Sequence, residues 1–286
     1  MAEEIIGGYK LHNLLQTGQT SQVWEVIETS SHRHFAMKLL LPEHATNPEH
    51  RSYLLHEAKV GIKMAHPNII RIVKFSDNPT NPHFVMEFFP SGSLKMRLMK
   101  KQTDFIREHA LNIFKQAATA FAFMNAQGWV HRDIKPDNLL VNSAGELRVI
   151  DFALTKRIEK PNFLSRLFRR RGKVQGTRSY MSPEQIRGEP LDGRADIYSF
   201  GATAYELTTG RPPFRGSSSQ ELLTKHLIEK PVSPRVYNPD LTEEFADLVL
   251  QMLAKKREDR PRDFHEVLMK LKTMKVYRDG SGKPSN

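Results

Sequence analysis

A short polar stretch near the middle of the chain carries residue types that catalysis needs. Asp133, Lys135 and Asn138 place an acid, a base and an amide within six residues, between a helical run and a strand-like run. Asp151 adds a second carboxylate at the end of the apolar run 147–150. Carboxylate and amide oxygens suit a hard divalent cation such as Mg²⁺, and a carboxylate beside them can orient a hydroxyl nucleophile. The stretch therefore predicts a catalytic site. The alternative, a turn with a local ion pair, leaves the ordered polar set at 131–138 unexplained.

Composition narrows the class of protein. A chain of 286 residues can form one large domain or two smaller ones, and 39% hydrophobic with 26% charged residues is typical of a soluble globular protein. The chain has no cysteine, which excludes disulfides and thiolate metal sites and fits a reducing compartment. No apolar run is long enough to span a bilayer, and the start is acidic, so we expect a cytoplasmic protein without a transmembrane segment. The net charge of +11 admits anionic partners without choosing among them.

The first part of the chain alternates in a strand-like way. Strands are expected between residues 9 and 41, with a polar turn at 30–33. Lys38 is a single cation inside an apolar run, where an ammonium is costly unless it meets an anion or reaches water from an edge strand. The run 51–65 has the apolar spacing of a helix, which Pro67 stops.

From Ser93 onward the pattern becomes helical. The run 105–127 predicts a long buried helix ended by Gly128, and its aromatic stripe indicates core. Two short strands at 139–141 and 147–150 follow the polar stretch, joined by a hairpin turn. The tail at 273–286 is polar, and we expect it to be disordered.

These patterns together resemble the catalytic domain of eukaryotic-type (Hanks-type) Ser/Thr protein kinases, and bacterial kinases of this type as much as small eukaryotic ones. The set H-R-D-x-K-P-x-N at 131–138, D-F-A at 151–153 and F-A-M-K at 35–38 carry the resemblance. It implies an α+β, bilobal protein-kinase fold for residues 9–272. The N-lobe at 9–86 would have a five-stranded antiparallel sheet and one main helix, followed by a hinge at 87–92 and a mainly helical C-lobe at 93–272.

The resemblance also implies roles in phosphoryl transfer from ATP to protein Ser or Thr hydroxyls. Asp133 would orient the acceptor hydroxyl and take its proton, and Lys135 would stabilise charge on the γ-phosphate. Thr177 would contact both of these side chains, while Asn138 and Asp151 would hold Mg²⁺. In the same way, Asp196 is expected to bond the backbone of the catalytic loop, and Arg260 to pair with Glu184.

For the nucleotide, the resemblance implies an ion pair between Lys38 and Glu57 that aims Lys38 at the α- and β-phosphates. Backbone groups of the hinge would take the adenine edge, with apolar side chains around it. The positions implied for ATP binding are Leu15, Gly18, Val23, Ala36, Lys38, Glu57, Met86, Glu87, Phe89 and Leu140.

Two departures from the family pattern affect these expectations. Only Gly18 remains of three loop glycines, and Gln16 and Ser21 at the outer positions hinder close approach of backbone to phosphate, so nucleotide affinity is expected to be reduced. Ala153 replaces the usual glycine and is expected to bias Phe152 toward one loop state. The alternative function is therefore a pseudokinase or weakly active nucleotide-binding scaffold, although all five signature catalytic positions are occupied.

The segment 156–178 holds nine Lys or Arg residues and one acid. It is either a solvated, self-repelling loop, a site for an acidic or phosphorylated partner, or an amphipathic turn on a membrane. In the family, an arginine placed like Arg132 often receives a phosphate, so Ser165 and then Ser179 are the candidates for regulatory phosphorylation. No basic recognition helix accompanies the charge, so no nucleic-acid partner is expected. The partners we expect are protein substrates, and the oligomeric state stays open.

Overall fold

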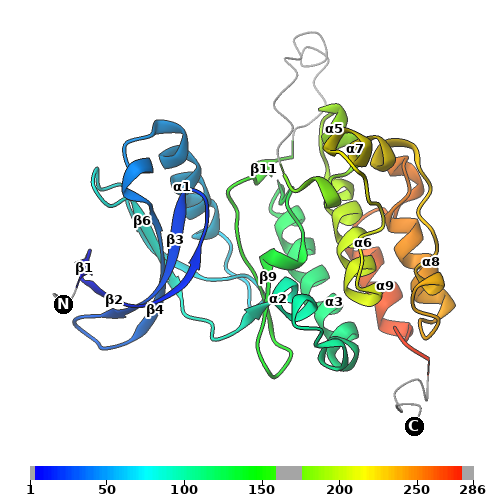
Figure 1. Cartoon of the computed structure of the whole chain (residues 1–286), viewed down its shortest axis with the longest axis horizontal. Helices are drawn as coiled ribbons and strands as arrows, with labels where there is room; N and C mark the ends of the chain where they lie inside the picture. The colour runs from blue at the N-terminus through cyan, green and yellow to red at the C-terminus, as the bar shows by residue number, and fades with distance from the viewer. Residues whose placement is uncertain (1–3, 159–175, 279–286) are drawn as a thin grey trace. The chain divides into compact units, whose positions relative to one another are not determined.

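The computed structural model describes residues 4–158 and 176–278, which form two compact units (Figure 1). The first unit contains residues up to Ser91 together with the short segment Ile150–Leu154. The second contains Gly92–Val149 and the chain from Thr155 onward. The boundary after Ser91 falls inside the segment predicted as a hinge.

The first unit is an antiparallel sheet with one main helix. Its six strands run in the order β1-β2-β3-β4-β6-β5. The strands are β1 (Ile5–Ile6), β2 (Tyr9–Thr17), β3 (Ser21–Glu28), β4 (His34–Leu40), β5 (Ile72–Ser76) and β6 (His83–Glu87). The prediction of five strands was wrong by one, because Gly7 and Gly8 form a turn that folds β1 back onto β2. Both glycines have positive φ angles, 59° and 88°, which side chains with a Cβ rarely adopt.

The helix of this unit is α1 (Pro48–Gly61), which carries Glu57. Its start is set by Asn47, whose side chain accepts hydrogen bonds from the backbone of Glu49 and His50, and by proline at the first helical position. At its end, a Cβ on Gly61 would lie 2.3 Å from the Ile72 side chain, so any larger residue would force Ile72 of β5 to shift. The strands of this unit also form an apolar cluster of buried side chains. It includes Ile6, Tyr9, Val26, Phe35, Met37, Leu39 and Val85.

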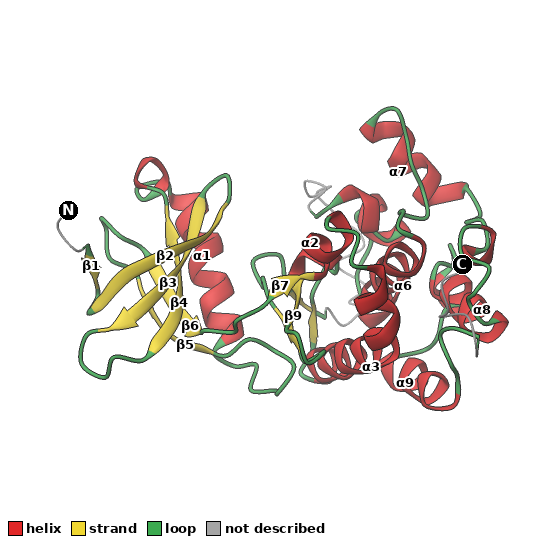
Figure 2. Ribbon diagram, turned by 60° about the horizontal axis from the view of Figure 1, so that its bottom comes forward, coloured by secondary structure: helices red, strands yellow, loops and turns green. Residues whose placement is uncertain are grey.

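The second unit is mainly helical. Its helices are α2 (Leu94–Met99), α3 (Thr103–Ala126), α5 (Pro183–Arg187), α6 (Gly193–Thr209), α7 (Ser219–Ile228), α8 (Glu243–Met252) and α9 (Phe264–Thr273). Its short strands are β7 (Gly92–Ser93), β8 (Trp129–Val130), β9 (Leu139–Val141), β10 (Leu147–Val149) and β11 (Lys156–Arg157). Helices α3, α6, α8 and α9 pack against one another, as Figure 2 shows. Across the parts of the chain that the structure describes, no helix is long and apolar enough to cross a membrane.

The long helix predicted at 105–127 is present as α3, and its aromatic stripe lies in the core as expected. The rings of Phe114 and Phe245 stack at 5.4 Å, and Phe121 contacts Phe200 and Phe264 at 6.3 and 5.5 Å between centroids. All five side chains are buried. These contacts join α3, α6, α8 and α9 into one core.

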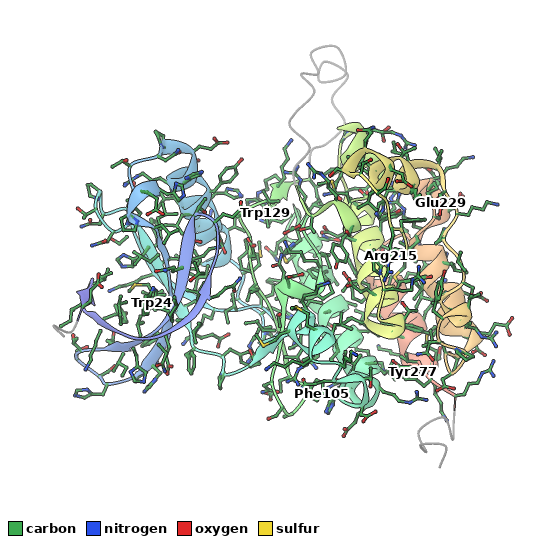
Figure 3. The ribbon with its side chains drawn as sticks, viewed as in Figure 1. Trp24, Phe105, Trp129, Arg215, Glu229 and Tyr277 are labelled. Carbon is green, nitrogen blue, oxygen red and sulfur yellow. The ribbon has the colours of Figure 1, made fainter. Side chains whose placement is uncertain are left out.

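The beginning of the predicted tail packs on this unit. The backbone N–H of Thr242 donates to the carbonyl of Val276 (3.0 Å), and the Val276 side chain is buried. Tyr277, labelled in Figure 3, receives the guanidinium of Arg107 over its ring at 4.5 Å. Residues 274–278 are therefore placed by hydrogen bonds and stacking, and residues 279–286 lie outside the described part.

A buried histidine makes the stability of the second unit depend on pH. His226 of α7 is fully buried, with its Nδ1 atom 2.9 Å from the Tyr198 hydroxyl and its ring 4.9 Å from that of Phe214. Burial, and then the nearby ammonium of Lys255, lower the pKa of His226 to about 3. The folded state therefore holds the neutral imidazole, which accepts a hydrogen bond from Tyr198.

We expect acid to destabilise the protein through His226. The folded pKa is depressed, so the unfolded chain binds the extra proton, and stability falls as the pH drops below the unfolded value of about 6.5. Between pH 7 and pH 5 this group removes about 2 kcal/mol from the free energy of unfolding. Urea titrations at the two pH values measure the difference. In His226→Gln, lowering the pH from 7 to 5 should remove clearly less of the free energy of unfolding. The same loss in this variant as in the natural protein would show that His226 is not the group responsible.

Candidate active site

The polar stretch forms a loop between β8 and β9 in the second unit, and a buried carboxylate holds its backbone. The N–H groups of His131 and Arg132 donate to the two oxygens of Asp196, at 2.8 and 2.9 Å. Asn125 donates to the same carboxylate at 3.1 Å. Burial raises the pKa of Asp196, against the opposing effect of these donors and of His131. The bonds hold Arg132 at a φ of 72°, a strained value for a residue with a side chain.

Asp133 lies at the centre of this loop, and three side-chain or backbone donors fix its carboxylate. Lys135 donates to Oδ2 (2.6 Å), and the backbone N–H of Thr177 donates to Oδ1 (2.9 Å). Asn138 donates from Nδ2 to the Asp133 carbonyl (2.8 Å) and to Oδ2 (3.2 Å). Lys135 also donates to the Thr177 hydroxyl at 2.8 Å. The structure thus brings the predicted residues Asp133, Lys135, Asn138 and Thr177 together within one unit.

The approach of Thr177 to Asp133 requires the glycine before it. Gly176 has a φ of 118°, and a Cβ there would lie 3.2 Å from the Arg132 carbonyl. Gln185, which sequence reasoning missed, donates to that same carbonyl at 2.9 Å. The chemistry available to this cluster is acceptance of a proton by a fixed carboxylate, with an ammonium beside it to neutralise developing negative charge.

The first unit holds the other predicted charge pair. Lys38 on β4 donates to Glu57 Oε2 at 2.7 Å. Burial alone would lower the pKa of the Lys38 ammonium, but the charges of Glu57 and Asp151 together raise it above its ordinary value. Burial raises the pKa of the Glu57 carboxyl, against the opposing effect of Lys38. β4 lies between β3 and β6, so the edge-strand reading of Lys38 does not apply.

The segment that carries Asp151 belongs to the same unit. Asp151 has a φ of 67°, and its Oδ1 accepts a hydrogen bond from the Ala153 N–H at 3.3 Å. Phe152 is fully buried beside Gly61, and its backbone is hydrogen-bonded to Glu57. The backbone at Ala153 is not in the left-handed region, so alanine adopts this state without the penalty that it would have at positive φ.

Strand register places several predicted nucleotide residues on one face of the sheet. Val23 is paired with Lys38, and Ala36 is paired with Met86. Paired residues share a face, and so do residues two apart along a strand, so these four side chains lie on the same face.

The other residues predicted to bind ATP lie on several different elements. Leu15 is about half exposed on β2 (48%), and the N–H of Gly18 closes the β2–β3 turn by donating to the Ser21 carbonyl at 2.8 Å. Glu87 ends β6, and Phe89 follows it. Leu140 belongs to the second unit, on β9.

The predicted regulatory residues are only partly described. Ser179 is half-buried in the turn Arg178–Tyr180, while Ser165 lies outside the described residues. Of the basic segment, residues 156–158 and 176–178 are described. Arg157 stacks on the ring of Trp129 at 4.4 Å and donates to the Gln127 carbonyl at 3.0 Å.

A sheet with a buried Lys–Glu pair and a helical unit with a fixed Asp–Lys–Asn loop are the parts found in enzymes that use a nucleotide as a phosphoryl donor. The sequence model of the protein kinase domain matches residues 9–271, and the chain therefore belongs to the protein kinase domain family.

Curated relatives agree with this assignment. A probable serine/threonine-protein kinase of Clostridium acetobutylicum is 31% identical over 267 residues, which is 93% of this chain and 40% of that protein. A probable serine/threonine-protein kinase of Streptomyces coelicolor is 31% identical over 91% of this chain and 39% of its own length. Serine/threonine-protein kinase PknB of Mycobacterium tuberculosis is 30% identical over 88% of this chain and 40% of its own. The chain thus spans about two fifths of the length of these relatives.

Proposed function

We propose that the chain is a Ser/Thr protein kinase that transfers the γ-phosphate of ATP to protein Ser or Thr hydroxyls, its own included. The observation that carries this proposal is the Asp133 carboxylate, held by Lys135, Thr177 and Asn138. The names of the relatives, which are serine/threonine-protein kinases, support the choice of acceptor.

Each residue of the cluster has a definite task in this proposal. Asp133 orients the acceptor hydroxyl and takes its proton, because its two oxygens are fixed by donors on both sides. Lys135 neutralises charge that develops on the transferred phosphoryl group. Thr177 keeps Lys135 and Asp133 in register through its hydroxyl and its backbone N–H.

The residues present fit ATP and Mg²⁺. Bound ATP supplies the phosphoryl group, and bound Mg²⁺ offsets the charge of its phosphates. Lys38 is a buried ammonium held by Glu57 and so is positioned to bind phosphate oxygens, next to the apolar side chains of Val23, Ala36 and Met86 on the same face.

Asn138 uses its Nδ2 atom on Asp133, which leaves the amide oxygen as a ligand, and Asp151 supplies a carboxylate; these two would hold Mg²⁺. Gln16 and Ser21 in place of loop glycines lead us to propose that ATP binds more weakly than to a glycine-rich loop.

Partners, location and regulation are further parts of the proposal. The basic segment 156–178 would bind an acidic or phosphorylated protein partner, since its charge favours anions.

Phosphorylation at Ser165, or at Ser179, would add a phosphate that Arg132 can pair with. A chain without cysteine suits a reducing compartment, and we propose the cytoplasm.

The test is a transfer assay with purified protein, Mg-ATP and a generic basic acceptor protein. We expect phosphoserine and phosphothreonine in the acceptor, no phosphotyrosine, and loss of transfer when a chelator removes Mg²⁺. Binding of ATP without any transfer would contradict the proposal and favour the pseudokinase alternative.

A further inference from the structure

An arginine beside Thr177 contacts a serine hydroxyl of helix α7. Arg178 donates from Nη1 to Ser219 Oγ at 2.7 Å, and both side chains are exposed. Ser219 is the first residue of α7, and this helix contacts the turn Arg178–Tyr180. Because the N–H of Thr177 donates to Asp133, the contact lies one residue away from a group that fixes the catalytic carboxylate.

Ser219 ends a run of three exposed serines, and the three hydroxyls have different partners. Ser217 donates to Glu221 Oε2 at 2.6 Å, and Lys225 pairs with the other oxygen of that carboxylate at 3.2 Å. Ser218 accepts a hydrogen bond from the N–H of Glu221 at 3.1 Å and so caps α7. Ser219 is the member of the run that an arginine contacts.

We propose that Ser219 is a phosphorylation site, whose phosphate pairs with Arg178 and holds the Thr177 segment against α7. This inference rests on the proposed function, because the phosphoryl donor is ATP and the enzyme is a second copy of the chain. Ser219 and Asp133 are fixed in the same unit, Ser219 by its helix and Asp133 by its hydrogen bonds, so the transfer takes place between two copies.

The transfer step balances without any other reactant. The Ser219 oxygen bonds to the γ-phosphorus of ATP while the bond from that phosphorus to the bridging oxygen breaks, and ADP leaves. Asp133 of the second copy takes the hydroxyl proton. The second copy can reach this hydroxyl because Ser219 is exposed.

A phosphate turns a weak contact into a strong one at Ser219. An exposed hydrogen bond between a guanidinium and a neutral hydroxyl contributes little, whereas a phosphate carries about two negative charges and offers several oxygens to the same donors. At Ser217 the same group would lie against the carboxylate of Glu221, and like charges repel. The geometry therefore distinguishes Ser219 from a neighbour with the same local composition.

A phosphate at Ser219 would hold this segment from two sides. On one side, the Ser199 hydroxyl of α6 donates to the Tyr180 carbonyl at 2.7 Å. The Tyr180 N–H donates in turn to the Thr177 carbonyl at 3.0 Å. The pair of the phosphate with Arg178 would add α7 on the other side. We therefore expect the catalytic carboxylate to be held more firmly and kcat to rise about threefold.

Peptide mapping by mass spectrometry after incubation with Mg-ATP tests the site. We expect phosphate on Ser219 of the natural protein, and on Ser219 of the control variant Ser217→Ala. After this incubation the natural protein should have a kcat about three times that of Ser219→Ala. A preparation that phosphorylates a generic acceptor protein but leaves Ser219 unmodified would overturn the proposal.

A second experiment is independent of transfer activity. Phosphoserine is introduced at position 219 during protein synthesis, and thermal unfolding is followed by circular dichroism. We expect the phosphate to raise Tm by about 2 °C in the natural background and to leave Tm unchanged in Arg178→Gln. Phosphoserine at position 217, the matched control, should give no rise. No rise with phosphoserine at 219, or a rise that persists in Arg178→Gln, would refute the pairing.

The two experiments separate this proposal from the proposed function. A protein that phosphorylates no acceptor would refute the kinase function, and the difference in Tm would still test the pair of Arg178 with the phosphate. A protein that phosphorylates an acceptor, but shows neither phosphate on Ser219 nor the change in Tm, would refute the phosphorylation site alone.

Discussion

Replacement of Asp133 by asparagine is expected to lower kcat by about 10³-fold, because the variant cannot accept a proton from the acceptor hydroxyl. Asn is the same size as Asp, so the loop keeps its shape, but an amide nitrogen must then face one of the donors from Lys135 or Thr177. KM for ATP should change by less than about threefold, because Asp133 acts on the acceptor and in the transition state.

Initial rates over a range of ATP and acceptor concentrations measure both parameters. The matched control is Asp247→Asn, which makes the same change at an exposed position on α8. We expect the control to keep the natural rate. A rate for Asp133→Asn within tenfold of the natural one would remove Asp133 from the catalytic role.

Replacement of Arg260 by methionine is expected to cost about 3–5 kcal/mol of the free energy of unfolding. The two terminal nitrogens of its guanidinium donate to Glu184, at 2.6 and 2.9 Å, and the two side chains are 0% and 3% exposed. The same guanidinium also donates to the carbonyls of Arg194 and Ala254, both at 2.8 Å. It donates to the Lys255 carbonyl as well, at 3.2 Å. Removal of the arginine therefore leaves a buried carboxylate and three carbonyls without these donors.

Urea unfolding measures this loss. Arg262→Met is the control, because Arg262 is an exposed arginine two residues further on, paired with Asp263 at 3.2 Å. Arg262→Met should lower the free energy of unfolding by less than about 1 kcal/mol, because exposed ion pairs contribute little to stability. Addition of Glu184→Leu to Arg260→Met should recover part of the loss, since the unpaired buried charge is then gone. Equal effects of Arg260→Met and Arg262→Met would contradict the structural role of the pair.

Local patterns predicted much of the second unit. Apolar spacing indicated α3 within about two residues at each end, because a long helix with one buried stripe repeats the same signal over many turns. The expected bonds from Asp196 to the loop backbone and from Arg260 to Glu184 are present. They could be expected only through the resemblance, because the partners are 65 and 76 residues apart.

Other features depend on geometry that the sequence does not display. The strand β1 depends on the positive φ angles of Gly7 and Gly8, and two residues are too few to show an alternating pattern. The pair of Lys95 with Glu206 joins residues 111 positions apart. The local sequence at 94–99 does not indicate that Lys95 meets a buried acid. Exposed and half-buried lysines have the same local sequence signals.

The most direct test of the central claim is one measurement of phosphate transfer from Mg-ATP to protein serine and threonine, by the natural protein and Asp133→Asn in parallel. Phosphoamino-acid analysis of the acceptor identifies the product. We expect phosphoserine or phosphothreonine with the natural protein and almost none with the variant. No transfer by the natural protein, or the same transfer by both, would contradict the account.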